Sequence, residues 1–76
     1  MKITYDKEAD AAYIYLIEDK DVKPQWVKHT YPCDPVEVKG IVNLDFDEHG
    51  KLGGIEIMDA SKKISQELID QAEVTS

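Results

Sequence analysis

The sequence predicts one small α+β domain spanning residues 1–76, with a five-stranded, mainly antiparallel, meander-like sheet and one C-terminal helix packed on one face. Two observations predict this class. Short segments with apolar residues at every second position recur between Gly, Pro and Asp residues, as expected for strands and turns. After Asp59 the apolar spacing changes to three and four residues, as expected for a helix. A chain of 76 residues has room for a single domain without a linker.

The first two strands are expected at Lys2–Tyr5 and Ala11–Ile17, joined by a turn at Asp6–Asp10. Aspartate side chains accept hydrogen bonds from nearby backbone amides, so they close turns of this kind. In the second segment, strand periodicity assigns side chains to opposite faces: Ala12, Ile14 and Leu16 on one, and Tyr13, Tyr15 and Ile17 on the other. Both faces of this strand are therefore partly apolar.

The third strand is expected at Trp26–Tyr31, after a charged loop at Glu18–Pro24. Pro32 ends it, because proline cannot donate to the ladder. The two prolines of the PCDP segment exclude a helix and favour a turn.

The fourth and fifth strands are expected at Gly40–Phe46 and Leu52–Met58. Between them, Asp47–Gly50 has the composition of a type I turn followed by a glycine with positive φ, which is typical of a short hairpin loop. Gly53 and Gly54 lie within the fifth strand and indicate a bulge or a close backbone approach.

The helix follows Asp59, with Ser61 or Ser65 as its N-cap. Its apolar stripe consists of Ile64, Leu68, Ile69 and Ala72. A helix this short gains its stability from tertiary packing. We expect the stripe to pack on the sheet face that carries Val42, Leu44, Phe46, Ile55 and Ile57.

Composition narrows the classes of function. Sixteen acidic residues against nine lysines give a net charge of −7, which disfavours binding to a nucleic-acid backbone. The longest apolar run is too short to span a bilayer, and the first residues do not resemble a signal peptide. With Cys33 as the only cysteine, the sequence favours a cytoplasmic protein with no membrane contact and no internal disulfide. His29 and Cys33 are four residues apart, but Pro32 lies between them, so they do not share a helix and their spacing does not bring them together as zinc ligands. The sequence therefore predicts no metal and no cofactor.

The segment DFDEHGKLGGIE, Asp45–Glu56, has the spacing of a calcium loop at its first, third, sixth and twelfth positions. Its fifth position is His49, a poor ligand for a hard cation, and its ninth is Gly53. A calcium loop of this type also needs a helix on each side, whereas both flanks have strand periodicity. The hairpin interpretation is therefore preferred.

A second acidic cluster surrounds the first turn. Asp6, Glu8 and Asp10 lie within five residues, next to Tyr5, a density that could hold a divalent cation or carry acid and base roles. The alternative is a turn capped by Asp side chains, with Glu8 in solvent. A single acidic cluster without a nucleophile favours the capped turn.

The outer face of the sheet, opposite the helix, is the stronger candidate for binding. It is expected to carry Tyr13, Tyr15 and Met58, with Trp26 as a further candidate, among Asn43, Asp45 and Glu56. Aromatic residues and Met among polar groups are typical of protein interfaces. The alternative, that loops fold over this face, stays open, although one helix covers only one side of a sheet.

Two stretches, YDKEADAAYIYL (Tyr5–Leu16) and GIVNLDFDEHGKLGGIEIMDASK (Gly40–Lys62), resemble a small bacterial and archaeal family of unknown function typified by the YuzE-like proteins. The resemblance implies a compact α+β domain without an established enzymatic activity. It maps the family pattern onto Tyr5, Asp6, Glu8, Ala9, Asp10, Tyr13, Asp47, Gly50, Gly54, Ile55, Glu56, Ala60 and Ser61. The chain departs from shorter members in the Pro32–Lys39 segment, which is longer here, so the resemblance implies no use for that loop. Some members are encoded near small putative toxins, so the resemblance also implies an antitoxin-like or regulatory role.

Three hypotheses follow for the function. The leading one is a non-catalytic protein-interaction module, with self-association as a homodimer as one version. The second is an acidic antitoxin-like partner of a small basic toxin. The third is a metal-dependent or acid/base enzyme that uses Tyr5, Asp6, Glu8 and Asp10.

Overall fold

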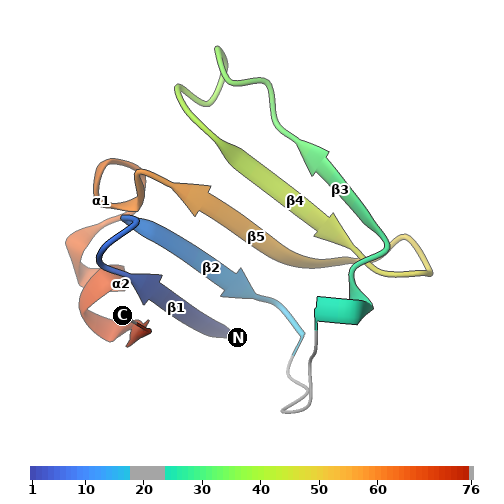
Figure 1. Cartoon of the computed structure of the whole chain (residues 1–76), viewed down its shortest axis with the longest axis horizontal. Helices are drawn as coiled ribbons and strands as arrows, with labels where there is room; N and C mark the ends of the chain where they lie inside the picture. The colour runs from blue at the N-terminus through green and yellow to red at the C-terminus, as the bar shows by residue number, and fades with distance from the viewer. Residues whose placement is uncertain (18–23, 76) are drawn as a thin grey trace.

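The computed structural model describes residues 1–17 and 24–75, and it contains one sheet with short helices at one end (Figure 1). The strands are β1 (Lys2–Asp6), β2 (Ala11–Tyr15), β3 (His29–Pro32), β4 (Val42–Phe46), β5 (Leu52–Met58) and β6 (Glu73–Val74). The helices are the 3-10 turn η1 (Pro24–Trp26), α1 (Ala60–Lys63) and α2 (Gln66–Gln71). The predicted α+β class is confirmed.

The strands are ordered β3-β4-β5-β2-β1-β6 across the sheet. Adjacent strands are antiparallel from β3 to β1, and only β6 pairs in parallel, through Thr4 with Glu73 and Tyr5 with Val74. The β3-β4-β5 meander therefore lies beside the β1-β2 hairpin. The two-residue β6 is too short to leave a periodic signal in the sequence, so it was not predicted.

The third strand begins later than predicted. Trp26 belongs to η1, and the strand starts at His29. The indole ring packs on Gly53: a Cβ atom at that glycine would lie 2.5 Å from Trp26 Cζ3. This contact accounts for the predicted close approach at Gly53, and the β4–β5 register shifts between Asp45 and Phe46, next to it. Of the predicted Glu18–Pro24 loop, residues 18–23 lie outside the described part of the chain.

The predicted single helix is instead two short helices, a correction that rests on Ile64. This residue is extended, with φ −119° and ψ 156°, and packs against the small hydrophobic core. Turning Ile64 inward interrupts the helix. Ser65 then caps α2 as predicted, because its hydroxyl accepts from the Leu68 amide at 3.2 Å. Neither helix in the described ranges is long and apolar enough to cross a membrane.

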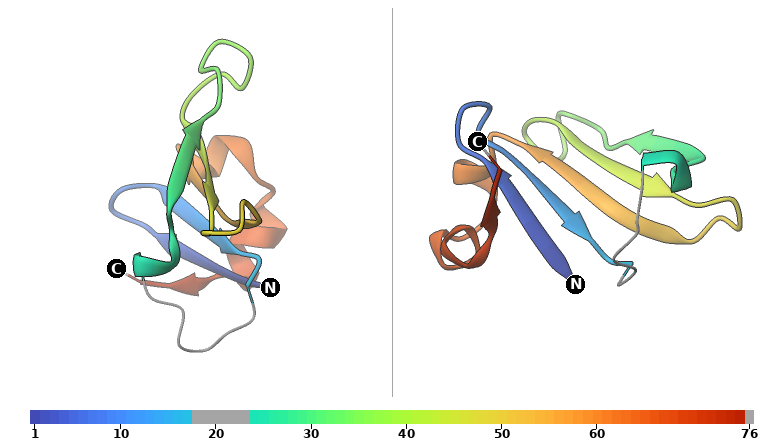
Figure 2. Two further views of the ribbon diagram at one scale, coloured as in Figure 1. Left: turned by 90° about the vertical axis from the view of Figure 1, so that its right-hand side faces the viewer. Right: turned by 60° about the horizontal axis from the view of Figure 1, so that its bottom comes forward.

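The two helices cover only one end of the sheet, near β1 and β2 (Figures 1 and 2). The core there consists of Ala12, Ile57 and Ala60, with Val42 and Ile55 among the residues packed against it. Leu44 and Phe46 were also expected beneath the helix stripe, but they do not belong to this core. The two helices are too short to reach β3 and β4, so within the described residues no helix lies over this side of those strands.

Candidate functional site

The strand registers define the open face of the sheet, opposite the helices. Asn43 pairs with Glu56 and Glu56 with Tyr13, while Asp45 pairs with Gly54 and Gly54 with Tyr15. Met58 pairs with Ala11 in the next row. Paired residues point to the same side of a sheet. The side chains predicted for the outer face, Tyr13, Tyr15, Asn43, Asp45, Glu56 and Met58, therefore share this face.

Asp45 is the centre of a hydrogen-bond network on the open face. The residue is buried, with 8% exposure, although it lies on the sheet face opposite α1 and α2. Tyr13 donates its hydroxyl hydrogen to Asp45 Oδ2, and Thr30 Oγ1 donates to Oδ1 at 2.6 Å. Burial, followed by the hydrogen bond to this carboxylate, raises the pKa of Tyr13 well above its ordinary value. The network joins β2, β3 and β4 across the sheet.

Glu56 makes the second polar contact of this face. It lies opposite Asn43, whose side-chain amide donates to Glu56 Oε1 at 2.8 Å. Asp45 pairs instead with Gly54, which lies two residues before Glu56 in β5. This hydrogen bond links the Glu56 side chain on β5 to Asn43 on β4.

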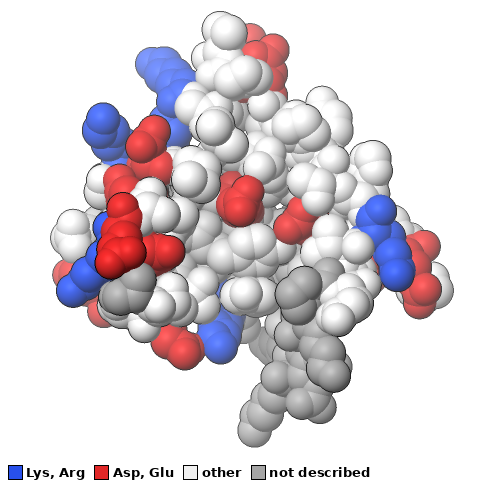
Figure 3. All heavy atoms as spheres, in the orientation of Figure 1, with Lys and Arg blue, Asp and Glu red and all other residues white. Residues whose placement is uncertain are grey.

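The aromatic residues of the open face are held by packing as well as by hydrogen bonds. The rings of Tyr13 and Tyr15 have centroids 4.6 Å apart at an interplanar angle of 50°. Tyr13 reaches Asp45 by crossing Gly54, where a Cβ atom would lie 2.7 Å from ring carbon Cε1. In the space-filling view of this face, acidic atoms lie in the middle of a largely uncharged area (Figure 3).

Two further residues of the open face were not among the predicted binding residues. Thr30 pairs with Asp45 from β3, and Ile41 lies beside Met58, whose amide donates to its carbonyl at 3.0 Å. Ile41 is 55% exposed and extends the apolar part of the face. Its position before β4 follows the same alternation as Asn43 and Asp45, a signal available in the sequence.

The acidic turn between β1 and β2 has a structural role. Asp6 Oδ1 accepts hydrogen bonds from the amides of Glu8 and Ala9, at 3.0 and 3.2 Å. This is the capped turn that the sequence suggested, and it uses the side chain as a substitute for a backbone acceptor.

Asp10 connects this turn to the C-terminal part of the chain. It has positive φ (51°), and its carboxylate accepts from Tyr5 Oη at 2.7 Å, from the Ser61 hydroxyl at 2.7 Å and from the Ser61 amide at 3.0 Å. We call Tyr5, Asp10 and Ser61 the Asp10 clamp. The Tyr5 hydrogen bond is the first cause of a lowered pKa for Asp10, and the same bond raises the pKa of Tyr5. The clamp holds the first residues of α1 against the β1-β2 turn.

The structure brings Tyr5 and Asp10 into direct contact through the hydrogen bond from the Tyr5 hydroxyl. Asp6 turns to the backbone of its own loop, and the Asp10 carboxylate is occupied by three donors. A pocket of about 480 Å³ lies beside the clamp. Its lining residues are Tyr5, Lys7, Ser61, Gln66, Ile69, Asp70 and Val74. Asp6, Glu8 and Asp10 do not line it.

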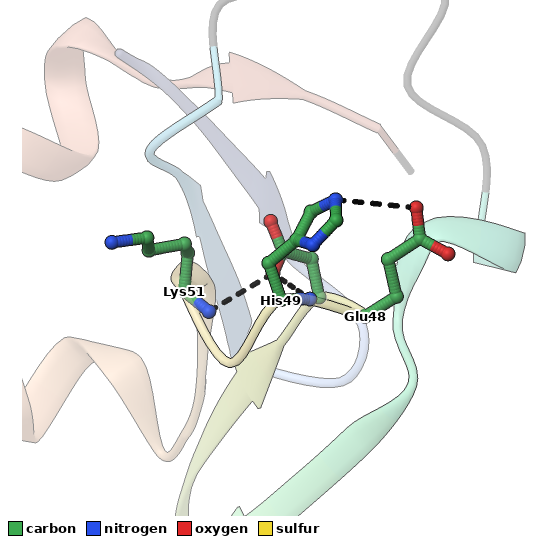
Figure 4. Close-up of polar contacts among 4 residues, drawn as sticks. Glu48, His49 and Lys51 are labelled. Carbon is green, nitrogen blue, oxygen red and sulfur yellow. Dashed lines mark hydrogen bonds and ion pairs between the residues drawn. The ribbon is translucent and has the colours of Figure 1, made fainter.

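The hairpin interpretation of Asp45–Glu56 is confirmed. Strands β4 and β5 flank the loop, and Gly50 has φ 76°. Asp47 Oδ1 accepts from the amides of His49 and Lys51, at 2.8 and 2.9 Å, and these bonds lower the pKa of Asp47 (Figure 4). The loop side chains at 48 and 49 pair with each other, His49 Nε2 to Glu48 Oε1 at 3.5 Å, on the surface.

The comparisons with known proteins agree with the resemblance seen in the sequence. A family model described as a protein of unknown function (DUF2283) matches residues 2–61. This span begins with β1 and ends at Ser61, the residue that completes the Asp10 clamp. No curated protein and no solved structure matches the chain. Because the family model covers well over half of its length, the chain belongs to the DUF2283 family, whose function is unknown.

Proposed function

We propose that this protein is a non-catalytic protein-binding module that engages its partner through the open face of the sheet. The observation that carries the proposal is the network of Tyr13, Asp45 and Thr30, which holds an aromatic side chain in one position on the sheet face opposite α1 and α2. Binding to a surface whose side chains are already ordered loses less conformational entropy than binding to a mobile one.

The residue types of the open face support binding to protein. Tyr13, Tyr15, Met58 and Ile41 supply apolar contact area, while Glu56 and Asn43 supply hydrogen-bonding groups between them. Interfaces are enriched in aromatic residues and Met at their centre and have polar groups around them.

Charge indicates the kind of partner. On the open-face positions of β2, β4 and β5, the charged residues are Asp45 and Glu56, both acidic, and the whole chain has a net charge of −7. A partner with a basic, partly apolar surface would be attracted to this face and oriented by it. A small basic toxin, as in the antitoxin hypothesis, is one partner with this chemistry.

The hydrogen bonding of the first turn favours this function over the acid/base alternative. Asp6 and Asp10 both accept several hydrogen bonds that hold the turn and α1 in place. A general base needs an acceptor directed at the substrate proton. These carboxylates are directed at the protein's own amides and hydroxyls.

The test compares two charge reversals of equal size. Glu56→Lys lies on the open face, and Glu67→Lys lies on the exposed surface of α2. Both variants change the net charge by the same amount. We expect a protein that co-purifies from the native host with the unaltered chain to be retained by Glu67→Lys and lost with Glu56→Lys. Equal retention by both variants would exclude the open face as the binding surface.

A further inference from the structure

The pocket beside the Asp10 clamp lies where the C-terminal part of the chain meets the first turn. Its volume is about 480 Å³, within the range of about 300–1,000 Å³ that is usual for small-molecule sites. Tyr5, Lys7 and Ser61 line it from β1, the first turn and α1, and the other lining residues come from α2 and β6. Strand β6 pairs with β1, which brings these distant segments together (Figure 1).

The apolar part of the pocket is built from three elements. Val74 of β6 pairs with Tyr5 of β1, so the two side chains project from the same side of the sheet. Ile69 of α2 is buried, whereas Val74 is 49% exposed. Covering an exposed aliphatic side chain with the apolar group of a ligand is favourable, because it removes apolar surface from water. The pocket therefore suits a ligand with an apolar body.

The two hydroxyl groups that line the pocket already donate to the protein. Tyr5 Oη donates to Asp10 Oδ1 and Ser61 Oγ donates to Asp10 Oδ2, each at 2.7 Å. A hydroxyl group has one hydrogen, so both oxygens can only accept hydrogen bonds from a ligand. A ligand in this pocket therefore meets acceptors at the clamp and must supply the donors.

Two opposite charges line the pocket without pairing with each other. Asp70, on α2, accepts a hydrogen bond on Oδ1 from the neutral amide of Gln66 at 2.8 Å. Lys7, in the first turn, has no ion pair with any residue in the ranges 1–17 and 24–75. One ammonium and one carboxylate are thus available at the same pocket. This arrangement fits a ligand that carries both a carboxylate and an ammonium group.

From the volume of the pocket, its two charges and its apolar residues, we infer that it binds a small zwitterion of the amino-acid class with an apolar side chain. The carboxylate of the ligand pairs with Lys7 and its ammonium group with Asp70, and the hydroxyl oxygens of the clamp are further acceptors for the ammonium group. The side chain of the ligand packs against Ile69 and Val74. A free amino acid and a short peptide share this chemistry.

The net charge of the chain separates this ligand class from simpler ions. With a net charge of −7, the protein repels a carboxylate that carries no positive group. A simple amine is attracted, but it leaves Lys7 without a partner. A zwitterion has no net charge to be repelled, and it uses both charged groups of the pocket. Tight binding should therefore need both charges of the ligand.

The first experiment titrates the full, unaltered chain with leucine and with two analogues of similar shape that each lack one charge. Isocaproate lacks the ammonium group, and isoamylamine lacks the carboxylate. The methyl NMR signals of Ile69 and Val74 should shift with millimolar leucine, whereas those of Leu44 on β4 should not. Each analogue should bind about two- to fivefold more weakly than leucine, which is the effect of losing one exposed ion pair.

Two substitutions assign the charges to their residues. Lys7→Gln should weaken leucine binding about two- to fivefold and leave the binding of isoamylamine, which has no carboxylate, unchanged. Asp70→Asn should weaken leucine binding to the same extent and leave the binding of isocaproate unchanged. The matched controls are Lys51→Gln in the hairpin loop and Glu67→Gln on the exposed surface of α2. They change the net charge by the same amounts, and neither residue lines the pocket, so leucine binding should stay the same.

A leucine–leucine dipeptide distinguishes the two sources of the ligand. Tighter binding of the dipeptide than of leucine would assign the pocket to short peptides, and the reverse order would assign it to free amino acids. Unmoved Ile69 and Val74 signals with both ligands would overturn the inference. Analogues that bind as tightly as leucine, or variants that weaken binding no more than their controls, would overturn it too. The co-purification test with Glu56→Lys concerns the open face and is independent of these results.

Discussion

Tyr13 on β2 crosses the backbone of Gly54 on β5 and donates a hydrogen bond to Asp45 on β4. The contact therefore spans three strands and depends on the absence of a side chain at residue 54. We expect Gly54→Ala to lower the free energy of unfolding by about 1–3 kcal/mol, because its methyl group would overlap the Tyr13 ring. Urea denaturation measures the loss. In a Tyr13→Ala background the same substitution should cost much less, and an equal cost would contradict the contact.

The raised pKa of Tyr13 predicts a loss of stability at alkaline pH. A phenol whose pKa is higher in the folded state contributes stability below its unfolded pKa of about 10, and this contribution is lost as the pH rises through the folded value. Urea midpoints measured from pH 8 to pH 11.5 should fall above pH 10. The fall should be smaller for Tyr13→Phe, and part of it should remain, because the pKa of Tyr5 is raised as well. An identical fall in the variant would contradict the assignment to Tyr13.

Tyr13→Phe should also weaken the fold at neutral pH. It removes one of the two side-chain donors to the buried Asp45 carboxylate, a loss that costs about 1–3 kcal/mol for a buried acceptor. Chemical denaturation at pH 7 gives the value. Tyr15→Phe is the control for removing a tyrosine hydroxyl from the same face, and we expect it to have a smaller effect than Tyr13→Phe.

Acid should destabilise the Asp10 clamp. The pKa of Asp10 is lowered in the folded state, first by the hydrogen bond from Tyr5, so its contribution is present above the unfolded pKa of about 3.9 and is lost as the pH falls below it. Asp10→Asn should lower the melting temperature at pH 7 and flatten its decrease between pH 5 and pH 2. Asp47, whose pKa is also lowered, accounts for part of the decrease that remains. An unchanged acid profile in Asp10→Asn would show that the clamp does not contribute.

Substitutions of Gly50 test the conformation of the hairpin loop that follows β4. Its φ of 76° is unfavourable for a residue with a side chain, although a Cβ atom there would meet no neighbour. We expect Gly50→Ala to cost about 1 kcal/mol of unfolding free energy, from backbone strain alone. Gly50→Asn should cost less, since Asn tolerates the left-handed region. Equal costs for the two variants would indicate another cause.

Divalent cations should not stabilise the protein. The carboxylates at the two places where the sequence suggested a cation, Asp47 in the hairpin and Asp10 in the clamp, already accept backbone or side-chain donors. Millimolar Ca²⁺ or Mg²⁺ should therefore leave the melting temperature unchanged. A rise of several degrees would show binding to the native state and would revive the metal-dependent hypothesis.

The composition of the open face followed from strand alternation. Because side chains alternate with a period of two, the short hairpin at Asp47–Gly50 determines which residues of β4 and β5 share a face. The same alternation places Tyr13 and Tyr15 of β2 on one face of the sheet. The bulge at Gly53 and Gly54 could be predicted, because glycine within a strand often marks a bulge or a close backbone approach.

Other contacts depended on partners distant in the chain. Nothing near Asp10 in the sequence indicates that it meets Ser61, 51 residues away. Ile64 fits a helical stripe, yet it leaves the helix because the core beside Ala12 and Ile57 accepts its side chain. Trp26 has strand propensity but lies in a 3-10 turn beside the bare backbone of Gly53. Tertiary packing outweighs local propensity at each of these positions.

The sequence by itself determined strands β1, β2, β4 and β5, the hairpin and the division of their residues between the two faces, because periodicity and turn chemistry are local properties. Only the tertiary structure decided how far the helices reach and therefore which part of the sheet lies under a helix. That extent depends on where Ile64 packs and on the strand order across the sheet. Both result from contacts between residues far apart in the chain.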